Sequence, residues 1–362
     1  MSTHSFVKSV VKTCLHIGKD DRVAIFAWRH TLDMAEAFAI ESKKTGAQVH
    51  TEFTTDEMFY GHLFNLPLDQ IKAPDPFALA LLDVSTANIF TSGPENPDRL
   101  KQVPPEKWNA MSKADKPFYD RILEKKIRSA QITLGYVTPY RAKTYGFNYD
   151  EWKENVNAAL DVKYEDMRRF GEKIRDAFER AQEVHITTPK GTDLTFSLED
   201  RPIHIYDGVI DDQDVEKGAI FTTLPSGTVH LAPIETSANG LVLADVPEPQ
   251  LGILPQGMKW VFKDGKVVSF EGGNNIEVVK KQWEKASGDK DRIGWLALGI
   301  NPKAKIGFAH NTIVLGTATV GIGDNRELGG KNESNYGTHL TVLKPTIELD
   351  GKPVIKRGEF AF

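Results

Sequence analysis

The sequence predicts an α/β protein of two domains, a doubly wound N-terminal α/β domain followed by a mostly antiparallel α+β domain. Three observations support this fold class. The chain has 362 residues, which is more than one ordinary hydrophobic core accommodates. Its first half alternates strand-like with helix-like patterns, and its second half consists mainly of strand-like runs separated by tight turns. We expect the domains to span residues 1–180 and 181–362.

The first half contains strand-like runs separated by helical patterns. The helical pattern at 32–44 places Ala35, Phe38 and Ala39 on one face. The strand-like runs are 22–27, 48–53, 87–90 and 131–137. Strands that alternate with helices predict a parallel sheet with helices on its faces.

The longest helical pattern, residues 149–181, is expected to link the domains and to break near Asp161. Beyond residue 183, turn sequences at 189–192, 263–266 and 349–352 separate apolar strand-like runs, which is typical of β-hairpins. One helix, at 276–285, is predicted to interrupt this β-rich half.

Composition excludes several classes of function. A net charge of −5 with 26% charged residues gives no basis for a nucleic-acid partner. No apolar run approaches the ~20 residues of a membrane span and no secretory signal is evident, so we expect a cytoplasmic protein. Cys14 is the only cysteine, which rules out an intrachain disulfide or a thiolate metal cluster. Glycine-rich phosphate motifs are absent from the first half, so no nucleotide cofactor is expected there.

Three segments of the last third, together with the Thr-Asp-Leu-Thr element at 192–195, point to a known family. They are LPSGTVHLAPIETSANG (224–240), RIGWLALGINPKAK (292–305) and GTATVGIGDNRELGGKNESNYGTHLT (316–341). The chain resembles the thermophilic aminopeptidase family, aminopeptidase T and its relatives, which binds paired divalent metals through Glu, His, Tyr and Asp. The resemblance implies that family's two-domain fold, a homodimer and metal-dependent removal of N-terminal amino acids from peptides.

Most of the family's metal ligands are replaced in this chain. The positions that match them are Thr228, Trp295, Thr319, Arg326, His339 and Thr341, so that His339 alone is retained. Threonine is a neutral, weak ligand and tryptophan offers no donor pair, whereas divalent cations need carboxylate charge. Arg326 adds a positive charge, and one histidine falls short of the three or so protein ligands of a catalytic zinc site. We therefore expect no cofactor; if a metal binds, we expect Zn, Mn, Co or Fe with His339 as a ligand.

Polar residues of the same segments are predicted to line the former metal cleft. They are His230, Glu235, Asp324, Asn325, Arg326, Lys331, Glu333, Tyr336 and His339. We assign catalysis to His339, Glu235 and His230, with Glu235 as a general base whose pKa is raised by desolvation. Arg326 and Lys331 would bind a substrate carboxylate or an oxyanion, and Trp295, Asp324 and Tyr336 would contact the substrate. Structural roles remain open for His230 on its strand and for Asp324 in a turn.

These assignments predict an aminopeptidase T-like hydrolase that acts on a small amide-like or heteroaromatic substrate without a dinuclear metal site. Three alternatives stay open: a metal-dependent aminopeptidase, a non-catalytic binding protein, and a ring-cleaving enzyme. The last resembles the dihydroxypyridine dioxygenases, a sister branch of the same fold.

Overall fold

A computed structural model describes residues 3–361, and the chain divides into two compact units. Unit 1 comprises Met1–Asp161 and Gly208–Ser226, and unit 2 comprises Val162–Asp207 and Gly227–Phe362. The predicted division at residues 180 and 181 differs from these units in two places. The second half of the long helical pattern belongs to unit 2, and a later segment returns to unit 1. That return adds a fifth strand to the sheet of unit 1.

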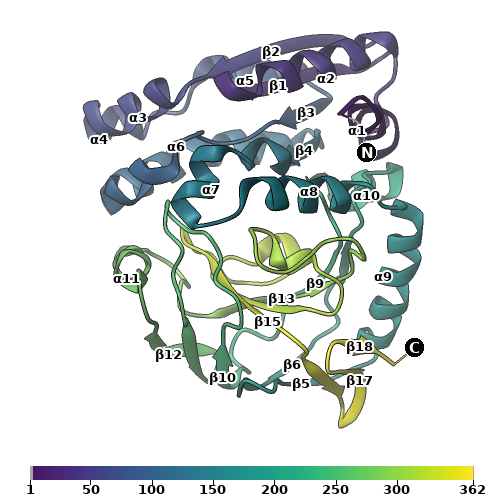
Figure 1. The fold of residues 1–362 in the computed structure, drawn as a ribbon, viewed down its shortest axis with the longest axis vertical. Helices are drawn as coiled ribbons and strands as arrows, with labels where there is room; N and C mark the ends of the chain where they lie inside the picture. The colour runs from purple at the N-terminus through teal and green to yellow at the C-terminus, as the bar shows by residue number, and fades with distance from the viewer. Residues whose placement is uncertain (1–2, 362) are drawn as a thin grey trace. The chain divides into compact units, whose positions relative to one another are not determined.

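Unit 1 is an α/β unit, drawn in purple to teal in Figure 1. Its strands are β1 (Arg22–Trp28), β2 (Gln48–Thr54), β3 (Ala87–Phe90), β4 (Arg128–Ile132) and β8 (Phe221–Leu224). Its α-helices are α1 (Thr3–Ser9), α2 (Leu32–Lys44), α3 (Asp56–Asn65), α4 (Leu68–Ile71), α5 (Pro76–Val84), α6 (Pro105–Glu124), α7 (Pro139–Tyr145), α8 (Tyr149–Leu160) and α10 (Asp212–Lys217). A π-helical turn, η1 (Val10–Cys14), follows α1, and 3-10 turns lie at η2 (Arg29–Thr31), η3 (Pro97–Gln102) and η4 (Thr133–Tyr136).

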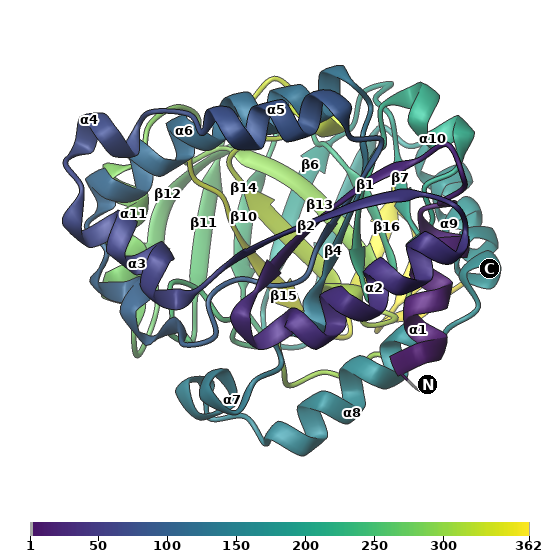
Figure 2. The same cartoon turned by 90° about the horizontal axis from the view of Figure 1, so that it is seen from above.

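The five strands of unit 1 form a parallel sheet in the order β2-β1-β3-β4-β8, which confirms the predicted doubly wound sheet. Figure 2 shows α1 and α2 on one side of these strands and α5 and α6 on the other. One strand prediction was partly wrong, because β4 ends at Ile132 instead of continuing to residue 137. The chain turns there because Gly135 packs against the backbone of the β3 loop, where an added Cβ would lie 1.9 Å from the Thr91 carbonyl oxygen.

Unit 2 is rich in antiparallel strands, as predicted for the second half. Its strands are β5 (Glu183–Thr187), β6 (Asp193–Ser197), β7 (His204–Tyr206), β9 (Thr228–Leu231), β10 (Asn239–Leu243), β11 (Lys259–Lys263), β12 (Lys266–Glu271), β13 (Ile293–Gly299), β14 (Ala318–Ile322), β15 (Thr338–Val342), β16 (Thr346–Leu349), β17 (Lys352–Lys356) and β18 (Glu359–Phe360). Its helical elements are α9 (Tyr164–Phe178), α11 (Ile276–Lys285), η5 (Asn311–Ile313) and η6 (Arg326–Leu328).

These strands form an eight-stranded sheet, β12-β11-β10-β6-β5-β16-β17-β18, and a five-stranded sheet, β15-β14-β13-β9-β7. The three predicted hairpins are confirmed, and the turn at 189–192 joins the antiparallel pair β5 and β6. Asp264-Gly265 joins β11 to β12 with φ values of 49° and 79°, and Asp350-Gly351 joins β16 to β17 with φ values of 49° and 76°. Positive φ at both positions is the signature of the type I′ turn that suits two-residue hairpins.

In unit 2, α9 covers one face of the five-stranded sheet β15-β14-β13-β9-β7. Gly171 of α9 approaches β7 so closely that an added Cβ would lie 2.6 Å from Ile205 Cγ2. Ile205 pairs with Val229 of β9, so both side chains point to this face. His204 and Tyr206 therefore point to the opposite face, which carries the candidate site. Across residues 3–361, no helix has the length and apolar character to cross a membrane.

Candidate functional site

The strand register brings five of the six matched ligand positions to one face of the five-stranded sheet. Thr341, Thr319, Ala297 and His230 are successive cross-strand partners from β15 to β9, and His204 of β7 follows His230. A neighbouring row contains His339, Gly321 and Trp295. Thr228 lies two residues before His230 and so points the same way. We call this surface, defined by His204, Tyr206, His230, Trp295 and His339, the histidine face.

Aromatic rings form a continuous layer on the histidine face. The His230 ring stacks on Trp295 with centroids 5.2 Å apart and an interplanar angle of 15°. The Tyr206 ring packs edge-to-face against His230 with centroids 5.0 Å apart. The centroid of the Trp295 ring also lies 5.6 Å from the centroid of the His339 ring. The four side chains are half-buried.

The histidines of this face are held in the neutral form. Burial and the neighbouring His204 and His339 lower the pKa of His230 to about 3. Burial also lowers the pKa of His339 to about 4, and the pKa of the nearby His310 to about 4. Neutral imidazoles at pH 7 each present one nitrogen that accepts a hydrogen bond.

A carboxyl group that the sequence did not reveal lies on the same side of the sheet. Glu248 is 6% exposed and accepts hydrogen bonds from Asn311 Nδ2 at 3.0 Å and Thr341 Oγ1 at 3.1 Å. Thr341 Oγ1 also lies 3.0 Å from Thr319 Oγ1. Burial raises the pKa of Glu248 to about 7, and its two hydrogen bonds offset only part of this effect. In the sequence Glu248 sits between two prolines in a loop, with no spacing that would connect it to β15.

The residues at the matched positions do not fit a paired metal site. Thr319 and Thr341 hydrogen-bond to each other, and Trp295 presents an aromatic surface where a carboxylate would be needed. In the described part of the chain, no group of three or more His, Cys, Asp or Glu side chains is arranged to hold a metal ion. The donor set thus lacks the negative charge that two divalent cations require.

Glu235, predicted as the general base, lies in a separate network. Its carboxylate accepts hydrogen bonds from both terminal nitrogens of Arg201 at 2.8 and 2.9 Å, and from Lys331 N at 2.7 Å and Asn325 Nδ2 at 3.2 Å. The predicted rise in its pKa is wrong. Burial alone would raise the pKa, but these donors lower it to about 2. A carboxylate so stabilised is a poor proton acceptor, and its contacts hold the loop after β14 in place.

The other predicted substrate-binding residues lie in the loop that joins β14 to β15. The Arg326 guanidinium contacts Asp324 Oδ2 at 2.6 Å and Glu333 Oε1 at 3.2 Å, so charges of its own loop neutralise it. The Lys331 side chain is exposed, and burial raises the pKa of the half-buried Tyr336. The structure thus brings His230, Trp295 and His339 together and assigns Glu235, Asp324, Arg326 and Lys331 to the loop network.

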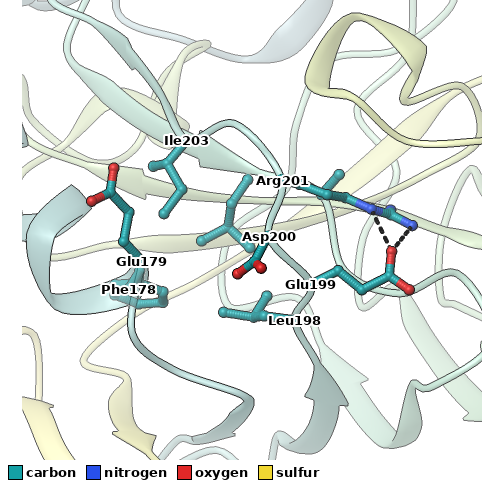
Figure 3. A pocket seen from close by; sticks show the side chains of 9 residues that line it. Phe178, Glu179, Leu198, Glu199, Asp200, Arg201 and Ile203 are labelled. Atoms are coloured by element: carbon teal, nitrogen blue, oxygen red, sulfur yellow. Dashed lines mark hydrogen bonds and ion pairs between the residues drawn. The ribbon is translucent and has the colours of Figure 1, made fainter.

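A cavity of about 280 Å³ lies on the other side of the five-stranded sheet (Figure 3). Phe178 of α9, Ile203 and Leu231 line it, and Leu231 points away from the face that carries His230. Its charged rim includes Glu179 and Asp200, and its one cation, Arg201, is already paired with Glu199 and Glu235. This cavity is therefore separate from the histidine face.

Comparisons with known proteins agree with the fold. AmpT from Thermus thermophilus superimposes with a TM-score of 0.82 over 99% of both chains at 20% sequence identity. A 2,5-dihydroxypyridine dioxygenase from Pseudomonas putida superimposes with a TM-score of 0.65 at 15% identity, over 99% of this chain and 96% of that one. The search of curated proteins found no match. Residues 2–313 match the model of the thermophilic metalloprotease (M29) family, and the chain therefore belongs to that family.

Proposed function

We propose that the protein is an aminopeptidase-like hydrolase that cleaves a small amide-like or heteroaromatic substrate on the histidine face without a dinuclear metal site. The observation that carries this proposal is the position of Trp295, which stacks on His230 and lies beside His339 where the family resemblance places a carboxylate ligand. An indole supplies a flat apolar surface for a ring, and the neighbouring neutral imidazoles supply hydrogen-bond acceptors.

The roles follow from the environment of each side chain. His339 and His230 are proposed to hydrogen-bond the substrate, because their imidazoles are neutral and each presents one acceptor nitrogen. Trp295 is proposed to bind the substrate ring. Glu235 is proposed to position the loop that carries Lys331, whose exposed ammonium group would attract a substrate carboxylate.

Two alternatives retain specific support. A metal-dependent aminopeptidase acting on peptides is supported by membership of the metalloprotease family. A ring-cleaving enzyme is supported by the fold likeness to the dioxygenase. A binding protein without catalysis remains the third class, because an aromatic surface can hold a ligand without chemistry.

The test combines metal content with hydrolysis. Purified protein would be dialysed against chelator, analysed for Zn, Mn, Co and Fe by mass spectrometry, and assayed with leucine p-nitroanilide and with small heteroaromatic amides. The proposal predicts hydrolysis that persists in chelator and is lost in His339→Asn. His185→Asn, on a strand of the eight-stranded sheet where His185 pairs with Asp193 at 2.8 Å, is the matched control and should retain activity. Activity that disappears in chelator and returns with metal would instead support the peptidase or dioxygenase.

We further propose that the protein is a cytoplasmic homodimer. The parallel sheet of unit 1 ends in β2, which pairs only with β1 among the described strands and whose Phe53 is 54% exposed. Natural proteins usually cover or charge such an edge. Light scattering at micromolar concentration should give twice the chain mass of 40.4 kDa, and a monomer would contradict the proposal.

A further inference from the structure

We propose that Glu248 is the acid–base carboxyl group of this site, which accepts a proton from the attacking water and returns it to the leaving amine. This inference rests on the proposed hydrolase function and adds a catalytic residue that neither the family resemblance nor the sequence pattern indicated.

The hydrogen bonds of Glu248 leave one of its oxygens available. Both bonds from the protein, from Asn311 and Thr341, end on Oε1. Oε2 accepts no hydrogen bond from a residue of the described chain. A carboxyl that is fixed through one oxygen and open at the other has a defined orientation and a site for one proton.

The two partners of Glu248 connect it to the histidines. Thr341 lies two residues beyond His339 on β15, so both side chains point to the histidine face, about 7 Å apart along the strand. Asn311 directly follows His310, whose pKa is lowered by burial and by the nearby His339. Glu248 is therefore held by the neighbours of two neutral imidazoles.

The surroundings of Glu248 differ from those of Glu235, another buried carboxyl in unit 2. Glu235 is paired with Arg201, and its pKa falls to about 2. The pKa of Glu248 is set by burial and by its hydrogen bonds from Asn311 and Thr341, with no cation among these causes. The histidines close in sequence to those partners, His310 and His339, are uncharged at neutral pH. A carboxyl that titrates near pH 7 transfers protons in both directions, which is the property that acid–base catalysis needs.

The step balances without a co-reactant. Water adds its oxygen to the carbonyl carbon of the amide while one of its protons moves to Glu248 Oε2. The C–N bond then breaks, and the same proton passes from Glu248 to the departing nitrogen. The products are a carboxylic acid and an amine, and Glu248 returns to its ionised form.

The first experiment observes the carboxyl itself. Infrared difference spectra of the full-length protein would be recorded across a titration, for the wild type and for Glu248→Gln. We expect a protonated-carboxyl band that disappears near pH 7 in the wild type and is missing from the variant, whereas the band of Asp115, whose pKa burial raises to about 6, should appear in both proteins. Glu235→Gln, the matched control, should retain the band that disappears near pH 7. A Glu248 that ionises near its ordinary value would overturn the proposal.

The second experiment measures the pH dependence of the chelator-resistant hydrolysis of leucine p-nitroanilide. Glu248→Gln is expected to lower kcat at least about 100-fold. Thr341→Val keeps the Glu248 carboxyl but removes a hydrogen bond that lowers the pKa of Glu248. The limb of the pH profile that reports the ionisation of Glu248 should therefore move to higher pH. A structural role would lower activity without moving the limb. Hydrolysis with an unchanged limb would overturn the role of Glu248 alone, whereas no metal-independent hydrolysis in the wild type would overturn the proposed function as well.

Discussion

Trp295 occupies the space directly above Gly321, its cross-strand partner on β14. A Cβ added to Gly321 would lie 2.1 Å from Cε2 of the indole, closer than any side chain permits. The missing side chain lets the indole lie across the sheet, where it reaches His230 on one side and His339 on the other. The tryptophan and the glycine thus form one structural unit.

Replacing Gly321 by alanine should displace the indole. We expect Gly321→Ala to lower the free energy of unfolding by about 1–3 kcal/mol, as overpacking in a close-packed region does. Urea unfolding followed by tryptophan fluorescence would measure it. Gly337→Ala is the control, because the nearest atom to its added Cβ, the Ile322 carbonyl oxygen, is 3.4 Å away. Equal stability of the two variants would show that Trp295 does not depend on Gly321.

Restoring the lost donors should create a metal site. We expect the variant Trp295→Glu, Thr319→His, Thr341→Asp to bind Zn²⁺, because these three residues and His339 would then supply four donors on one face of the sheet. Isothermal titration calorimetry would measure binding in this variant and in the wild type. The same variant with His339→Asn should bind more weakly. Tight stoichiometric binding by the wild type would contradict our assessment of its donor set.

The Arg201–Glu235 pair should stabilise unit 2 in a pH-dependent way. Both side chains are largely buried, with 7% of Arg201 and 9% of Glu235 exposed. Glu235→Ala should therefore lower the free energy of unfolding by about 3 kcal/mol, because it leaves Arg201 without this partner. The pKa of Glu235 is lowered to about 2 from 4.5, so its ionised form stabilises the folded state above pH 4.5. That contribution disappears as the pH falls from 4.5 towards 2. The stability difference between the wild type and Glu235→Gln, measured by urea unfolding, should shrink over this range; a constant difference would argue against the ion pair.

The histidine face should make the folded protein sensitive to mild acid. The pKa of His339 falls from 6.5 to about 4 on folding, so the unfolded chain binds the proton more readily below pH 6.5. The free energy of unfolding should therefore decrease between pH 6.5 and about 4. Between pH 7 and about pH 5, the free energy of unfolding of the wild type should fall by about 2 kcal/mol because of His339. His339→Asn should not show this part of the decrease. Parallel denaturation curves of both proteins at the two pH values provide the measurement, and identical pH dependence would show that His339 is not buried in its neutral form.

The sequence determined the local elements well where the signal lies within a short stretch. The helices at 32–44 and 276–285 follow from apolar spacing and have the predicted bounds. The hairpins at Asp264-Gly265 and Asp350-Gly351 follow from residues that tolerate positive φ. The family resemblance also identified His339, Trp295 and His230 as neighbours, because strand alternation preserves which residues share a face.

Only the tertiary structure decided the chemistry of the two carboxyl groups. Glu235 and Glu248 lie close together in the sequence, and desolvation alone would raise the pKa of each. Arg201, more than thirty residues earlier in the chain, pairs with Glu235 and holds it ionised, whereas Glu248 accepts hydrogen bonds from Asn311 and Thr341, which lie in distant segments. Local sequence patterns and the family resemblance determined the fold class and which residues share the histidine face. The charge state of each buried acid depends on contacts between residues far apart in the sequence, which no spacing in the chain encodes.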